Sequence, residues 1–225
     1  MTKDDYVKFI NDPKHMINPP RDIRMFDSDF LEAFSKTSWY IIPLFWSPVI
    51  LYLTSSANAT NTEIAITWTI GFFLWELVEY LLHRFVFHCE DALPDNGAAL
   101  FAHFMAHGIH HAFPMDRYRL VFPIVPGYSL GIMLYSVYWL LFPSAYVRLL
   151  FAGTLIGYIQ YDLTHYYLHH SRPHFARFRE LKTYHMLHHY RDPLNGYGIT
   201  SKVFDKLFGT LLDTSMMTSD KKKQS

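Results

Sequence analysis

The sequence predicts an all-α integral membrane protein, in which four transmembrane helices form two hairpins and carry a cytosolic helical cap. Half of its 225 residues are hydrophobic and 18% are aromatic, a composition rich in apolar side chains for a soluble chain. Several apolar stretches have the length that a helix needs to cross about 30 Å of hydrocarbon. Histidines recur in the polar segments at helical spacings. These three observations together favour a membrane anchor that carries a metal site.

Four apolar stretches are expected to cross the membrane. The first has no charge and begins with the interfacial residue types Trp39 and Tyr40, and the second has Glu76 and Glu79 near its end. Prolines at the start of the third are expected to kink or delay it. The expected spans are 39–57, 64–82, 120–142 and 146–167. They lie in a membrane domain of residues 39–212, between an N-terminal arm (1–38) and a tail (213–225).

The distribution of basic residues predicts the orientation. The two short connections between the spans hold one Lys or Arg, Arg148, and the other nineteen lie in residues 1–38, 84–119 and 170–225. By the positive-inside rule, both termini and the polar segments face the cytosol. Lys222 and Lys223 stand where the dilysine retrieval signal of endoplasmic reticulum membrane proteins stands, so that membrane is the expected location. No cleavable signal peptide is apparent.

Simple counts exclude two classes of protein. The single cysteine, Cys89, rules out a disulfide framework. The net charge is zero and no basic tract is interleaved with aromatic residues, so nucleic-acid binding is not expected.

Ten histidines fall into four tight sets, and neutral imidazole is the commonest nitrogen ligand of transition metals. Residues i, i+3 and i+4 share a helix face, so each H-x-x-H-H trio is expected to aim three rings at one point. One H-x-x-x-H pair alone is weak evidence, but four sets are hard to obtain by chance. Ten ligands are too many for one ion and suit two. The predicted two-metal site consists of His83, His88, His107, His110, His111, His165, His169, His185, His188 and His189.

Residues beside these sets are expected to support the ligands. Glu79 stands one turn before His83 and is predicted to accept a hydrogen bond from that ring, with a purely structural hydrogen bond as the alternative. His103 and His170, each next to a set, are interpreted as supporting or structural.

The segments around the histidines resemble those of the fatty acid 2-hydroxylases, which belong to the fatty acid hydroxylase/sterol desaturase superfamily. The resemblance covers most of residues 25–212. It is carried by EYLLHRFVFH (79–88), HGIHHAFPMDRYRLVFP (107–123), YDLTHYYLHH (161–170), YHMLHH (184–189) and GYGITSKVFDKLFGT (196–210).

The resemblance implies a di-iron monooxygenase that uses O2 to hydroxylate carbon 2 of long and very long acyl chains for ceramide synthesis. It implies that the ten histidines bind two iron ions, and that electrons come from NAD(P)H through a reductase and cytochrome b5. Zinc binds similar ligands more tightly than ferrous iron, so purified protein is expected to contain some zinc. The sequence has no His-Pro-Gly-Gly haem motif, so it resembles the short form that takes electrons from a separate donor.

Charged residues beside the sets suggest further roles. Asp162, three residues before His165, is expected to orient that ligand. Arg117 and Arg119 are candidates for contact with a substrate carboxylate or headgroup, with charge at the membrane edge as the alternative. A basic rim for an acidic electron donor is expected at Arg117, Arg119, Arg172, Arg177, Arg179 and Lys182.

Two other functions remain as alternatives. A sterol C-4 methyl oxidase or C-5 desaturase of the same superfamily typically opens with H-x-x-x-H, whereas His83 and His88 are five apart. A membrane metal transporter would place its ligands at mid-membrane, whereas these histidines lie at helix ends and in polar segments. Both comparisons favour the acyl 2-hydroxylase.

Overall fold

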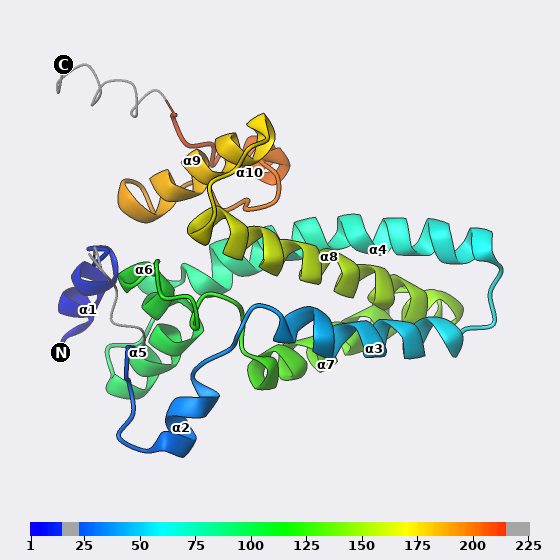
Figure 1. The fold of residues 1–225 in the computed structure, drawn as a ribbon, viewed down its shortest axis with the longest axis horizontal. Helices are drawn as coiled ribbons and strands as arrows, with labels where there is room; N and C mark the ends of the chain where they lie inside the picture. The colour runs from blue at the N-terminus through cyan, green and yellow to red at the C-terminus, as the bar shows by residue number, and fades with distance from the viewer. Residues whose placement is uncertain (15–22, 215–225) are drawn as a thin grey trace. The chain divides into compact units, whose positions relative to one another are not determined.

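The computed structural model describes residues 1–14 and 23–214, and these residues form helices and connecting segments with no β-strand (Figure 1). The predicted all-α class is therefore confirmed for the described part of the chain. Contacts divide the chain into two compact units. Unit 1 comprises Met1–Ile17, Tyr80–Met115 and Tyr167–Ser225, and unit 2 comprises Asn18–Glu79 and Asp116–Tyr166. The dilysine sequence lies outside the described residues, and the expected boundaries at residues 38 and 212 stay predictions.

Unit 2 holds the helices at the four positions where spans were expected. Two helices of the described chain are long and apolar enough to cross a membrane, one over Asn61–Phe87 and one over Ile124–Leu141. The apolar helix α3 has only 15 residues, about 22 Å at 1.5 Å per residue, which is short of a bilayer core. The helices of this unit are α2 (Asp29–Phe34), α3 (Ile41–Ser55), most of α4 (Asn61–Leu82), α7 (Ile124–Leu141) and most of α8 (Ser144–His170).

Prolines set the start of α7. Pro123 is its N-cap residue and has an extended conformation, so the helix begins at Ile124 instead of Leu120. Pro126 lies in the first turn, where the missing N–H would have no helical partner in any case. The predicted delay of this helix is confirmed.

Glycines let α4 and α8 approach until their backbones touch. A Cβ on Gly71 would lie 2.1 Å from the Leu150 carbonyl oxygen, and one on Gly153 would lie 2.3 Å from the Trp68 carbonyl oxygen. The Thr154 hydroxyl lies in the same interface and donates to the Gly71 carbonyl oxygen at 3.1 Å. Small residues that bring backbones together are typical of helix pairs in membranes.

Helix α2 is fixed within unit 2 by a buried ion-pair network. Arg119 donates to Glu32 Oε1 and to Asp116 Oδ2, both at 2.8 Å, and all three side chains are buried. Burial opposes ionisation of Glu32, but hydrogen bonds from Lys36, from two backbone N–H groups and from Arg119 outweigh it and lower the pKa of this carboxyl to about 2. Glu32 is therefore charged at neutral pH and holds the α2 segment to residues 116–119.

Unit 1 consists of short helices around the histidines. Two of its turns are π-helical, η1 (His83–Phe87) and η3 (Phe104–Gly108), a rare form that is frequently found at functional sites. A small core of Tyr6, Ile10 and Leu100 fixes the N-terminal helix within this unit. The other elements are α1 (Lys3–Ile10), the 3-10 turn η2 (Glu90–Ala92), α5 (Gly97–His103), α6 (Ile109–Ala112), the end of α8, α9 (Ala176–Tyr190) and α10 (Val203–Phe208).

Candidate metal centre

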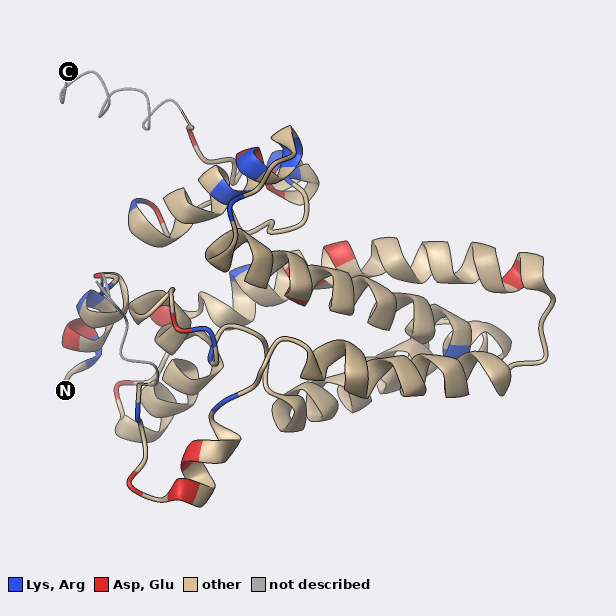
Figure 2. Cartoon of the chain, in the orientation of Figure 1, with Lys and Arg blue, Asp and Glu red and all other residues tan. Residues whose placement is uncertain are grey.

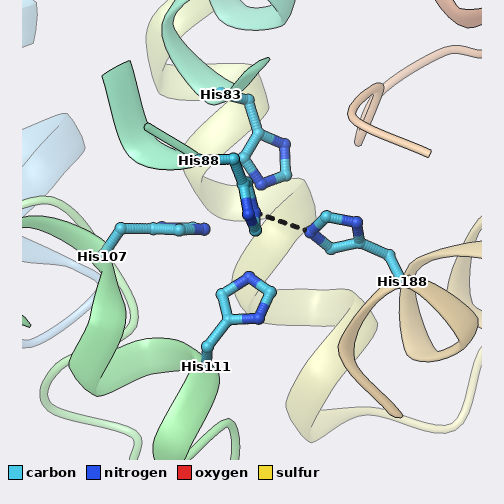
Figure 3. Close-up of side chains that lie close together, drawn as sticks. All are labelled: His83, His88, His107, His111 and His188. Atoms are coloured by element: carbon cyan, nitrogen blue, oxygen red, sulfur yellow. Dashed lines mark hydrogen bonds between the residues drawn. The ribbon is translucent and has the colours of Figure 1, made fainter. Parts of the chain in front are cut away.

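The predicted histidines gather into two groups with converging ring nitrogens. In the first group, which lies wholly in unit 1, the ligand atoms all lie within 4.8 Å of one another. Figure 3 shows its five side chains pointing toward a common centre: His83, His88, His107, His111 and His188. The same limit holds within the second group for His110, His169, His185 and His189 of unit 1. His165 stands one turn before His169 on α8.

The two H-x-x-H-H trios are each divided between the groups, so the expectation that a trio converges on one point is wrong. His107 and His111 face the first group, while His110 faces the second; His185 and His189 face the second group, while His188 faces the first. Helical residues four apart differ in direction by only about 40°, whereas adjacent residues differ by about 100°. The middle histidine of each trio therefore reaches the other group. Helices α6 and α9 each supply ligands to both groups.

A π turn brings His83 and His88 to the same group. On a regular α-helix, residues five apart would point about 140° away from each other. Here the His88 N–H donates to the His83 carbonyl oxygen at 3.0 Å, the i→i+5 bond of a π turn. The two ring centres are consequently 5.0 Å apart.

The nitrogen spacing fits transition-metal ions. His88 Nε2 lies 3.1 Å from His188 Nε2 (Figure 3), and His169 Nε2 lies 2.8 Å from His185 Nε2. Two nitrogens bound at about 2.0–2.1 Å to one ion lie roughly 3 Å apart.

Buried ring nitrogens without protein partners support the same conclusion. Among the described residues, His83 Nε2, His107 Nε2 and both ring nitrogens of His111 have no hydrogen-bond partner. A buried polar atom left in that state costs about 1–3 kcal/mol. A bound cation would satisfy His83 Nε2, His107 Nε2 and one of the two His111 nitrogens, so the residues present fit a metal ion.

The rings are held in the neutral form that binds metals. Burial, followed by the neighbouring histidines, lowers the pKa of His107, His111 and His189 well below the usual value. Protonation therefore does not compete for these ligands at neutral pH.

Two histidines of the first group are oriented by acceptors at Nδ1, and a third has a carboxylate nearby. The Nδ1–H of His83 donates to the Tyr197 carbonyl oxygen at 2.6 Å, and that of His188 donates to the Asn195 carbonyl oxygen at 2.8 Å. His88 Nδ1 lies 3.3 Å from Glu90 Oε1. An acceptor at Nδ1 fixes the tautomer and leaves Nε2 for a metal. These acceptors were missed from sequence, where the only signals are the glycines at 196 and 198 and an acid two residues after His88.

The residues predicted to support the ligands lie outside both groups. His103 is buried, accepts from the Tyr6 hydroxyl at 2.5 Å and donates to the Phe87 carbonyl oxygen at 2.7 Å, next to His88. His170 is half-buried and ends α8 beside His169.

Two predicted carboxylates lie in unit 2. Asp162 accepts from the Tyr158 hydroxyl at 3.0 Å and from the Phe122 N–H at 3.2 Å. Glu79 is buried. The support of ligands by Glu79, Asp162, His103 and His170 stays a prediction.

The two arginines that follow the second histidine set differ in exposure. Arg119 is 6% exposed and engaged by Glu32 and Asp116, so it does not contribute to an exposed basic rim. Arg117 is exposed, and its contact with a substrate or partner stays a prediction.

The fold and the two histidine groups define an all-helical protein with a histidine-rich candidate metal centre and apolar helices of membrane length. The chain belongs to the fatty acid hydroxylase family, whose model matches residues 68–210. This confirms the resemblance seen in the histidine segments.

Characterised relatives cover most of the chain. It is 41% identical over 211 residues to a dihydroceramide fatty acyl 2-hydroxylase of Arabidopsis thaliana, covering 92% of this chain and 86% of that protein. It is 41% identical over 220 residues to the ceramide very long chain fatty acid hydroxylase of Saccharomyces cerevisiae, covering 93% and 54% respectively. A structure described as full-length Scs7p with only the hydroxylase domain visible gives a TM-score of 0.89 at 39% identity, covering 95% of this chain and 80% of that one. The chain thus spans about half the length of the yeast relative.

Proposed function

We propose that this chain inserts one oxygen atom of O2 at carbon 2 of long and very long acyl chains destined for ceramides. The observation that carries the proposal is the pair of buried histidine groups in a member of the fatty acid hydroxylase family. Relatives about 40% identical are named as 2-hydroxylases or ceramide fatty acid hydroxylases. The ten predicted histidines, His165 included, are proposed as the ligands of two iron ions.

Bound iron and the protein's side chains would have different roles in the reaction. Bound iron supplies the redox chemistry for attack on an unactivated C–H bond, which amino-acid side chains lack. The protein contributes neutral imidazoles, turned toward the centre by the Asn195 and Tyr197 carbonyls, and burial that limits access of water. Zinc is expected to compete for these nitrogen ligands and has no redox chemistry, so zinc-loaded protein is expected to be inactive.

We also propose that α3, α4, α7 and α8 cross the endoplasmic reticulum membrane as two hairpins, with both termini and the histidine groups on the cytosolic side. Local thinning of the bilayer would accommodate the short α3. Helices α3 and α7 contain no charged residue (Figure 2). Both helices expose large apolar side chains, which lipid would cover: Leu44, Leu51, Ile132, Met133 and Leu140. The one-sided distribution of Lys and Arg supports the cytosolic orientation.

Lipid analysis tests the reaction. Expression in cells that lack their own 2-hydroxylase is expected to produce ceramides with 2-hydroxy acyl chains. The His188→Ala variant is expected to lower this product at least about 100-fold, because it removes a ligand of the first group. His174→Ala, which changes an exposed histidine outside both groups, is the matched control and is expected to retain the product. Ceramides without 2-hydroxy acyl chains, in cells that contain folded and iron-loaded protein, would contradict the proposed reaction.

The electron donor proposed is cytochrome b5, reduced by its reductase with NAD(P)H. Arg172, Arg177 and Arg179 are exposed in unit 1, and Figure 2 shows basic residues along α9. An acidic redox protein would be steered to such a surface. Lys182 lies nearby but is half-buried and donates to the Ser171 carbonyl oxygen at 2.8 Å.

Reconstituted protein is expected to form 2-hydroxy product only when cytochrome b5 is added to iron, NADH and reductase. Arg177→Glu with Arg179→Glu is expected to raise the KM for cytochrome b5 several-fold, with kcat at saturating donor retained. An increase in ionic strength from about 0.05 to 0.5 M is expected to slow the reaction, because salt screens exposed charges. Glu180→Gln on the same helix is the control. Full turnover without cytochrome b5 would show a different electron route.

A further inference from the structure

One short turn orients two ligands of the first group. The Asn195 carbonyl accepts the Nδ1–H of His188, and the Tyr197 carbonyl accepts that of His83. The two histidines come from different helical segments, yet their ring centres are 4.8 Å apart. The position of residues 195–197 therefore determines where both Nε2 atoms point.

A single buried carboxylate holds this turn. Asp205, on α10, has no exposed surface. Its Oδ1 accepts from the Tyr197 N–H at 2.9 Å and from the Thr210 hydroxyl at 2.8 Å. Its Oδ2 accepts from the Gly198 N–H at 2.9 Å. Asp205 thus binds the backbone of Tyr197, whose carbonyl orients His83.

The turn has little freedom to compensate for loss of these bonds. Gly196 has a φ of +78°, a conformation that favours glycine, and its N–H donates to the Thr210 carbonyl oxygen at 2.9 Å. A Cβ at Gly198 would lie 2.0 Å from the Ser201 carbonyl oxygen. The conformation therefore depends on two glycines and on the Asp205 carboxylate.

We propose that Asp205 is a positioning residue for the first metal group, acting through the 195–198 turn on His83 and His188. The inference rests on the proposed two-metal centre and adds a residue that touches neither ion. The Tyr184 side chain on α9 also hydrogen-bonds the Asp205 carboxylate. His83 and His188, both of the first group, take their Nδ1 acceptors from the turn, so the effect is expected mainly in that group.

The Asp205→Asn variant tests this at nearly constant size. The asparagine amide can take either of two orientations, and in each its NH2 group faces the backbone N–H of Tyr197 or of Gly198. Both groups are donors, so that hydrogen bond is lost. The turn is expected to shift and turn the two carbonyls away from the His83 and His188 rings. Residues that support metal ligands typically contribute 10–100-fold in metal affinity. The first group is therefore expected to release its metal at least about 10-fold faster to a chelator.

Two background variants identify which group is affected. His107→Ala disables the first group and His169→Ala disables the second, so each leaves one ion per chain. Asp205→Asn is expected to speed release at least about 10-fold in the His169→Ala background and to have a several-fold smaller effect in the His107→Ala background. Release is followed with zinc-loaded protein and a colorimetric chelator, so the measurement does not depend on enzymatic turnover. Glu180→Gln removes a surface carboxylate that pairs with Lys202 and is the control.

The outcomes separate the inference from the proposed function. Unchanged release in the His169→Ala background, or equal acceleration in both backgrounds, overturns the role of Asp205. Wild-type protein that binds fewer than two ions contradicts the two-metal centre itself. If Asp205→Asn does not fold, Thr210→Val replaces it, because it removes one side-chain hydrogen bond to the carboxylate and keeps both backbone bonds. That variant is expected to speed release roughly 3-fold in the His169→Ala background only, and any other pattern overturns the inference.

Discussion

Purified protein is expected to contain about two transition-metal ions per chain, and loss of one ligand is expected to remove about one of them. His107→Ala should empty the first group and His185→Ala the second, since each removes one of the converging nitrogens in its group. The double variant should contain almost no metal. Elemental analysis of protein purified in detergent gives the ratio directly.

The exposed His174 provides the matched control, and His174→Ala is expected to keep both ions. A wild-type ratio near one ion, or single variants that still bind two, would contradict the division into two sites. Activity should fall with loss of either ion, because the proposed reaction uses both.

Gly153→Ala is expected to destabilise unit 2 strongly. Its Cβ would lie 2.3 Å from the Trp68 carbonyl oxygen and 2.7 Å from the Trp68 Cα, so α4 and α8 would have to separate. Forced overpacking typically costs about 1–3 kcal/mol, and backbone atoms yield less easily than side chains. The midpoint of thermal unfolding in detergent should fall by about 5 °C or more.

Gly97→Ala is the comparison for this variant. A Cβ at Gly97, the first residue of α5, would meet nothing within 4 Å. Alanine is the better helix former, so stability should be unchanged or slightly higher. Equal unfolding midpoints for the two variants would show that α4 and α8 do not pack as described.

The histidines that gather into the two groups could be predicted from sequence because helical spacing and a single residue type carry the information. Their division between two groups was missed because residues i, i+3 and i+4 of a helix were expected to point in one direction. Relative to residue i, residue i+4 is rotated by about 40° and residue i+3 by about 60° in the opposite sense. The short length of α3 was also missed, because a charge-free sequence does not show where the helix begins.

Other features of the site depend on contacts between distant residues. Arg119 meets Glu32 across 87 positions of sequence, and no local pattern pairs them. The acceptors for His83 and His188 are main-chain carbonyls, which every residue possesses, so residue type could not reveal them. From sequence alone, Asp205 is indistinguishable from a surface acid on an amphipathic helix. Only the structure shows that it is buried against the 195–198 turn.

The π turn at His83–Phe87 has a consequence for how related sequences are compared. A π turn accommodates one residue more than an α turn and returns the chain to the same side of the helix. A chain with one residue fewer between the two histidines would close as a regular α turn and still present both rings to one ion. The H-x-x-x-x-H spacing here, closed by a π turn, and the H-x-x-x-H spacing typical of sterol-modifying members, closed by an α turn, can therefore place their two rings in the same way. The number of intervening residues therefore does not by itself decide whether two histidines can reach one ion.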